Sequence, residues 1–148
     1  MQNNSGFTLI ELLIVVTIIG LIAAMAIPNL VNAVDKAKQR KTMGDMRQLG
    51  SAVEMYAVEN NTYPKVGSYA ALAPLIQPTY VKTVSGTDGW NHGWVFTGDT
   101  TNGSEYTFVS LGKDGKPSVV TGGATSDFAC DIVFANGQFF QWPSGTQT

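Results

Sequence analysis

The feature that most constrains this chain is a long apolar segment close to its N-terminus. Residues 7–27 (FTLIELLIVVTIIGLIAAMAI) are 21 residues with a single charge, Glu11. As an α-helix this segment spans roughly 30 Å, which matches the hydrocarbon thickness of a bilayer. A helix in a soluble core keeps a polar face, and no polar face follows Glu11. The sequence therefore predicts a membrane-spanning helix.

A secretory signal peptide is the alternative explanation for this segment. Ala24, Met25 and Ala26 resemble a small-residue cleavage site, after which the chain would start at Ile27. However, the preceding residues, MQNNSG, contain no Lys or Arg, whereas a signal peptide opens with basic residues. A glutamate inside the apolar stretch is also unusual for a signal peptide. We therefore expect the helix to be retained.

Glu11 is the unusual residue of this helix, because a carboxylate near the end of a membrane helix is costly unless it is paired or protonated. One interpretation is that its side chain reaches the membrane interface. The other is that it pairs with a cation inside the apolar layer. No Lys or Arg occurs before Lys36, so such a cation would come from another chain.

Beyond Pro28 the pattern changes to apolar residues at helical spacing, among them Met46, Leu49 and Val53. No strong helix breaker occurs before Asn60 and Pro64. The spacing predicts one helix from about 7 to 59, bent at Pro28 because a proline inside a helix removes a hydrogen bond.

The rest of the chain predicts a small antiparallel sheet packed on this helix, which is an α+β fold. Residues 92–98, 105–111 and 131–141 have the composition of strands. Within the last segment, Asn136-Gly137 is a strong signal for a two-residue hairpin turn of type I′. A short helix is expected to begin at Tyr69, before Pro74 and Pro78.

Composition excludes several kinds of chemistry. The formal net charge of −2 argues against nucleic-acid binding through a general positive field. One cysteine, Cys130, cannot form an internal disulfide, and one histidine, His92, excludes a zinc site built on two or more imidazoles. No nucleophile–base pair and no phosphate-binding loop occurs in the sequence, so we expect no enzymatic activity.

Residues 6–12, GFTLIEL, resemble the processing motif of type IV pilins and of the pseudopilins of type II secretion. The resemblance implies that a prepilin peptidase cuts between Gly6 and Phe7 and then N-methylates Phe7. It also implies that Glu11 is the family's assembly glutamate and that Pro28 is its helix-bending proline. The leader, MQNNSG, departs from the family because it lacks the usual basic residue.

Physical chemistry gives a reason for this pattern. Cleavage after Gly6 exposes an α-amine at Phe7, one helical turn from Glu11 of the same chain, so the two groups are able to pair within a monomer. Side-by-side packing with a one-step axial stagger would place Glu11 beside the amine of a neighbouring chain. Since an unpaired buried charge costs several kcal/mol, only the correct register satisfies both groups. Polymerisation follows from the two charges and the apolar helix surface.

The second half of the chain is similar to the major pseudopilin of type II secretion. The shared elements are Tyr63-Pro64, an L-x-x-L segment at 72–75, Pro78-Thr79-Tyr80 and a D-P-W-G element. Residues 88–91 match this last element only in part, because Gly89 replaces the proline and Asn91 the glycine. The resemblance implies a structural subunit of a helical filament that drives protein export.

A type IV pilin for adhesion, twitching motility or DNA uptake is the alternative function. Most such pilins link their C-terminal region with a cysteine pair, which the single Cys130 cannot provide. A membrane-tethered binding module that never polymerises is a third class.

The same resemblance implies calcium as a cofactor. Residues 110–115 (SLGKDG) resemble the opening of the family's calcium loop, and residues 130–132 resemble its end. Asp114 and Asp131 are the implied ligands, with Asp127 and the carbonyl of Leu111 as further candidates for an ion that takes six to eight oxygens. The alternative is that Asp114 lies in an ordinary turn and that Asp131 is a surface acid.

These implications divide the chain into three parts: a leader peptide at 1–6, a transmembrane and polymerisation helix at 7–30, and a periplasmic domain at 31–148. The domain is expected to comprise a helix over 31–59 and a globular part over 60–148. The implied partners are other copies of the chain, prepilin peptidase, the inner-membrane assembly platform and minor pilins or pseudopilins. The resemblance implies a single-pass inner-membrane protein with its C-terminal domain in the periplasm, which assembles into a filament in the periplasm or at the cell surface.

Overall fold

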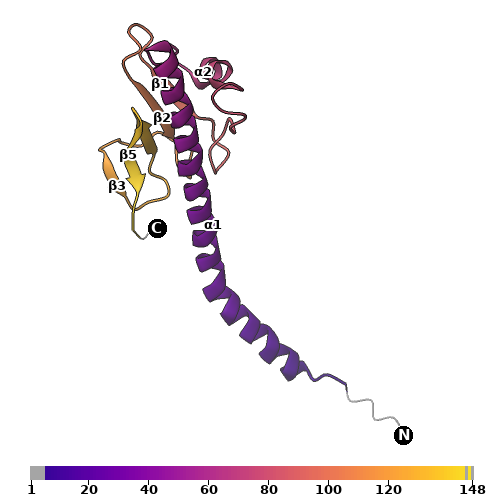
Figure 1. Ribbon diagram of the computed structural model, residues 1–148. Coiled ribbons are helices and arrows are strands. Elements are labelled where there is room, and N and C mark those ends of the chain that lie inside the picture. Colours follow the sequence, from indigo (N-terminus) through magenta and orange to yellow (C-terminus); the bar gives the residue numbers. More distant parts are fainter. Residues whose placement is uncertain (1–5, 146, 148) are drawn as a thin grey trace. The chain divides into compact units, whose positions relative to one another are not determined.

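The structure of the protein is a computed structural model that describes residues 6–145 and 147. The chain divides into two compact units, with the boundary between Val34 and Asp35. Its elements, shown in Figure 1, are α1 (Leu9–Asn60), α2 (Tyr69–Ile76), β1 (Val95–Gly98), β2 (Tyr106–Ser110), β3 (Gly123–Thr125), β4 (Ile132–Ala135) and β5 (Gln138–Pro143). The α+β class expected from the sequence is confirmed.

The first helix, α1, is one continuous element of 52 residues, as the sequence predicts to within two residues at its start. The helix continues through Pro28, which has no N–H to donate and therefore leaves one backbone carbonyl without its helical partner. It ends at Asn60, because Asn61 takes a left-handed conformation with φ of 58°. Asparagine tolerates this conformation better than most residues.

The second helix, α2, begins at Tyr69 as expected and continues through Pro74. Ser68 caps the helix, and its Oγ accepts a hydrogen bond from the Ala71 N–H at 3.4 Å. Pro74 removes one helical hydrogen bond, but Leu72 and Ile76, which lie one turn apart, are both fully buried. Burial of two large aliphatic side chains offsets the lost bond.

The five strands form one sheet in the order β1-β2-β4-β5-β3. The pairs β1–β2, β2–β4 and β4–β5 are antiparallel, as expected from the sequence. Strand β3 was not predicted, and it pairs in parallel with β5, with Ala124 opposite Trp142. The sheet is therefore mostly antiparallel, and its first strand begins at Val95 rather than at residue 92.

The hairpin between β4 and β5 forms at the predicted Asn136-Gly137 turn. Both residues have positive φ, 47° and 85°, as a type I′ turn requires. Asn136 Oδ1 accepts from the Tyr106 N–H at 2.9 Å. The Tyr106 hydroxyl accepts from the Gly137 N–H at 3.0 Å and donates to the Glu54 carboxylate at 2.9 Å. Burial, followed by the neighbouring Glu54 carboxylate, raises the pKa of Tyr106. The hydroxyl therefore stays a donor and links the turn to α1.

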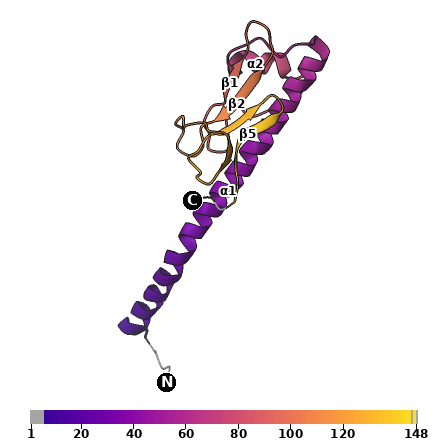
Figure 2. The same ribbon diagram turned by 90° about the vertical axis from the view of Figure 1, so that its left-hand side faces the viewer.

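The core of the second unit lies between α1 and one face of the sheet (Figure 2). Phe96, Phe108 and Phe134 stand opposite one another on β1, β2 and β4 and supply the aromatic layer. The α1 side of this core consists of Met46, Leu49, Ala52 and Val53, at the helical spacing seen in the sequence. This packing fixes the sheet on the helix and thereby positions the loops that follow β2 and precede β4.

Candidate functional site

The start of α1 places Glu11 in a capping box with Thr8. The Glu11 carboxylate accepts from the Thr8 N–H at 2.9 Å and from the Thr8 hydroxyl at 2.6 Å, and the Thr8 Oγ1 accepts from the Glu11 N–H at 3.3 Å. This reciprocal arrangement satisfies N–H groups that a helix start otherwise leaves unpaired. The carboxylate is therefore held at the first turn of α1 by Thr8, the residue that follows Phe7.

The first unit presents its apolar side chains to the outside. The large apolar residues from Phe7 to Val34 are exposed, which is costly in water but favourable in lipid. Two polar side chains of this stretch hydrogen-bond to the helix itself: Thr17 donates to the carbonyl of Leu13 at 2.7 Å, and Asn29 donates to that of Met25 at 3.2 Å. By length and composition α1 is able to cross a membrane.

The second candidate site is the pair of aspartates implied as calcium ligands. Asp131 is only 2% exposed, and its Oδ2 accepts from the Ser118 N–H at 3.1 Å. Its other oxygen, Oδ1, is buried and has no hydrogen-bond partner among the described residues. A buried carboxylate oxygen without a partner is costly, and such a group needs an explanation such as a bound ion. Asp131 is thus not the surface acid of the alternative interpretation.

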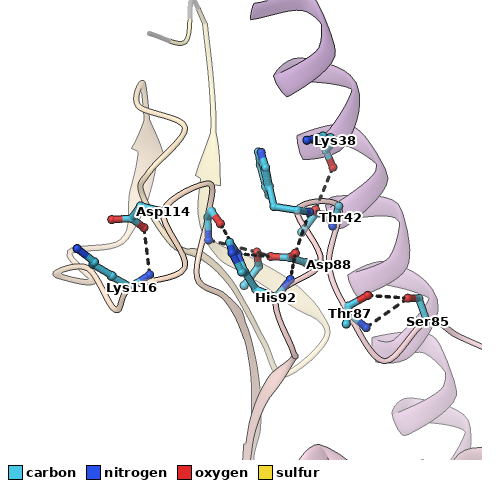
Figure 3. A network of polar contacts seen from close by, with 12 residues as sticks. Lys38, Thr42, Ser85, Thr87, Asp88, His92, Asp114 and Lys116 are labelled. Atoms are coloured by element: carbon cyan, nitrogen blue, oxygen red, sulfur yellow. Dashed lines mark hydrogen bonds and ion pairs between the residues drawn. The ribbon is translucent and has the colours of Figure 1, made fainter. Parts of the chain in front are cut away.

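The negative charge of Asp114 acts on Asp131. Burial raises the pKa of Asp131, hydrogen bonds from Ser118 act in the opposite direction, and the negative charge of Asp114 raises the pKa further. Asp114 itself closes a turn, in which its Oδ1 accepts from the Lys116 N–H at 3.1 Å (Figure 3). Two carboxylates in mutual repulsion, one of them buried, form an environment that favours a cation.

The two further candidates are placed differently. Asp127 Oδ1 accepts from the Ala129 N–H at 2.9 Å, and its carbonyl accepts from the Cys130 N–H at 3.2 Å, so Asp127 closes a turn of its own. Leu111 follows β2 and precedes Gly112, which has a φ of 63°. Within residues 6–145 and 147, no group of three or more His, Cys, Asp or Glu side chains is placed to hold a metal. An ion at Asp131 would therefore depend on two carboxylates and on carbonyl oxygens.

A loop that sequence reasoning did not connect with this site, residues 88–92, lies between α1 and the turn that carries Asp114. Asp88 is 1% exposed and accepts from the Ser110 hydroxyl at 2.6 Å and from the N–H groups of Trp90 and His92, each at 2.9 Å. His92 Nδ1 donates to the carbonyl of Gly112 at 2.9 Å. Figure 3 shows Asp88 and His92 within this network, next to α1. The sequence indicated a D-x-W element, but nothing in it revealed these partners.

The contacts of Gly89 explain why this chain has a glycine where the family's D-P-W-G element has a proline. Its N–H donates to the Thr42 hydroxyl at 2.9 Å, which a proline could not do. A Cβ at this position would overlap the backbone carbonyl of Lys38. The loop therefore approaches the backbone of α1 more closely than a residue with a side chain allows.

Substitution of Gly89 by alanine is expected to lower the free energy of unfolding by about 1–3 kcal/mol, because the added methyl group forces the loop away from α1. Gly93→Ala is the matched control, since a Cβ at Gly93 has no heavy atom within 4 Å. Thermal melting of the two variants measures the difference. Equal melting temperatures would show that the close approach at Gly89 is not required.

Comparison with known protein families gives two matches. Residues 29–127 match the family described as "Type II secretion system (T2SS), protein G". Residues 1–27 match the "Prokaryotic N-terminal methylation motif". The first match covers the second half of α1, the 88–92 loop and Asp114, and it ends before Asp131.

Curated relatives agree with these family matches. The chain is 32% identical over 139 residues to the type II secretion system core protein G of Pseudomonas aeruginosa, covering 85% of this chain and 92% of that protein. It is 31% identical over 126 residues to the protein of the same name from Escherichia coli K12, covering 78% and 86%. The corresponding Vibrio cholerae protein is 31% identical over 134 residues, covering 84% and 83%. No solved structure matches the chain.

Proposed function

The chain belongs to the family of type II secretion system protein G, the major pseudopilins that form the pseudopilus, and we propose how its own residues carry out this role. It is a structural subunit and not an enzyme. We propose that prepilin peptidase cuts the chain between Gly6 and Phe7 and N-methylates Phe7. The matched methylation motif over residues 1–27 supports this step.

The observation that carries the proposed assembly mechanism is the position of the Glu11 carboxylate. It lies in the first turn of α1 and already accepts from the N–H and hydroxyl of Thr8. After cleavage, the new N-terminal amine belongs to Phe7, the residue next to Thr8. A neighbouring subunit with the right axial stagger would bring its own amine to Glu11, and both charges would then be paired away from water.

Apolar association acts together with this charge pairing. The exposed apolar side chains between Phe7 and Val34 would leave lipid and pack against the same segment of other copies. Packing of such a mostly apolar surface selects an axial position only weakly. The single acid therefore fixes the register, while the apolar surface supplies the contact area.

Membership of the family supports a proposal for the remaining partners and for the location. The apolar helix is consistent with anchoring in the inner membrane. We propose a single-pass topology in which residues 31–148 lie in the periplasm. The proposed partners are other copies of the chain, prepilin peptidase, the inner-membrane assembly platform and minor pseudopilins.

Calcium is the proposed cofactor. Asp131 and Asp114 would hold the ion through carboxylate oxygens, which are the hard ligands that calcium prefers. The buried Oδ1 of Asp131 without a partner supports this assignment, because a cation would supply the missing interaction. The ion would neutralise the repulsion between the two aspartates, and the other ligands would be carbonyls of residues 111–131.

Deletion of the gene for this chain is expected to block protein export and to leave folded exported proteins in the periplasm. Plasmid-borne wild-type chain should restore export, and a chain without residues 1–6 should not, because it lacks the cleavage site. Immunoblots of periplasm and culture medium measure the distribution. Normal export together with a loss of twitching motility would instead support the alternative, a type IV pilin.

A further inference from the structure

We propose that an ion pair between Asp35 and Lys113 couples the metal turn, defined as residues 112–115, to α1. The inference rests on the calcium site proposed above. Asp35 is the first residue of the second unit, and Lys113 immediately precedes the implied ligand Asp114. Through this pair, the state of the metal turn would be transmitted to the α1 segment 35–42.

The contacts of Asp35 are those of a fully engaged buried carboxylate. Asp35 is 4% exposed, its Oδ2 accepts from Lys113 Nζ at 2.8 Å, and its Oδ1 accepts from Trp90 Nε1 at 3.2 Å. Burial raises the pKa of Asp35, but the hydrogen bonds from Lys113 and Trp90 and the positive charge of Lys113 outweigh burial, so the pKa lies below its usual value. Removal of either donor leaves a buried charge with one partner.

Besides Asp35, Lys113 also contacts Phe128. Its N–H donates to the carbonyl of Phe128 at 2.8 Å, and its ammonium group lies 5.9 Å from the centre of the Phe128 ring. The backbone and the side chain of Lys113 therefore both have partners. Because the side chain is not free to reorient, a movement of the turn also moves the ammonium group that binds Asp35.

His92 holds the metal turn at Gly112 and lies against it at Gly115. Its Nδ1 donates to the Gly112 carbonyl, and its ring lies so close to Gly115 that a Cβ there would be 2.8 Å from Nε2. Asp114 thus lies between anchored residues, in a turn whose position is set by the 88–92 loop and by α1. Calcium binding that orders this turn would favour the Asp35–Lys113 pair, and by linkage the pair would favour calcium binding.

Hydrogen exchange of the full mature chain in detergent micelles, with calcium or with the chelator EGTA, tests the coupling. In the wild-type chain, EGTA is expected to accelerate amide exchange at least about fivefold in 111–131 and also in 35–42, since coupled sites typically differ by such factors. In Lys113→Met, the response should persist in 111–131 and be strongly reduced in 35–42, where the hydrogen bonds from Trp90 to Asp35 and from Gly89 to Thr42 remain. Lys113→Arg, which keeps the cation, should retain both responses.

Lys116→Met is the matched control, because Lys116 contacts Asp114 through its backbone N–H, which the substitution keeps. It should respond as the wild-type chain does. A wild-type response confined to 111–131, or an unchanged response at 35–42 in Lys113→Met, would overturn the coupling and leave the calcium site intact. No calcium response at 111–131 in the wild-type chain would overturn both.

Discussion

Replacement of Glu11 by alanine is expected to abolish filament formation while leaving a subunit that inserts and folds. Each variant subunit would bring the charged amine of its neighbour into an apolar layer with no partner. The cost of several kcal/mol for such a charge opposes every subunit addition. Electron microscopy of sheared filaments, with quantification of the assembled fraction, measures the effect.

Two further variants separate charge pairing from helix capping. Glu11→Asp should assemble at an intermediate level, because the charge is kept on a shorter side chain. Thr8→Val removes the hydroxyl that hydrogen-bonds to Glu11 in the capping box but keeps the carboxylate. If Glu11 acts through the neighbouring amine, Thr8→Val should assemble better than Glu11→Ala. Filament yields of Glu11→Ala equal to those of the wild-type chain would refute the pairing mechanism.

Calcium is expected to raise the melting temperature of the chain substantially. Binding to the folded state alone adds about 2.7 kcal/mol at a hundredfold excess over Kd. For a chain of this size that corresponds to roughly 5–10 °C. Magnesium should have much less effect, because it requires a tighter octahedral site and gives up water reluctantly. Thermal melting during a calcium titration, with EGTA as the reference, measures the shift.

Asp114→Asn combined with Asp131→Asn should remove the calcium effect without unfolding the chain. The core between α1 and the sheet and the Asn136-Gly137 hairpin contain neither carboxylate. The matched control is Asp127→Asn, because Asp127 closes a separate turn. A wild-type melting temperature that does not respond to calcium would mean that the Asp114 turn is an ordinary one and that Asp131 has a structural role.

The elements that were predicted correctly from the sequence have strong local signals. The helix α1 combines an apolar run with a regular apolar stripe and has no breaker before Asn60 and Pro64. The β4–β5 hairpin has two residues that suit positive φ between strand-forming segments. In each case local conformational preference and burial favour the same structure, so a short stretch of sequence is sufficient.

The elements that were missed depend on distant contacts. Strand β3 has only three residues, and it forms because β5, some 15 residues later, offers a free parallel edge. The continuation of α2 through Pro74 depends on the burial of Leu72 and Ile76, which outweighs a local breaker. Local conformational preference does not predict β3 or the continuation of α2, since burial in the folded chain overrides that preference.

In the candidate sites too, residues with a local sequence signal were predicted, and contacts between distant segments were not. The motif around Glu11 is contiguous, so the sequence indicated the acid, though not its capping box with Thr8. The two aspartates, Asp114 and Asp131, were identified by resemblance. The buried oxygen of Asp131 and the contact between Lys113 and Asp35 arise only when segments far apart in the chain are folded together.

Intact mass spectrometry of the chain isolated from membranes and from assembled filaments tests the central claim most directly. The claim is that this chain is a processed filament subunit whose charged N-terminus and Glu11 direct assembly. The expected mass is that of a chain that begins at Phe7 and carries one N-methyl group. A chain that begins at Ile27, after cleavage at the signal-peptide-like site, would lack the polymerisation helix and would contradict the account.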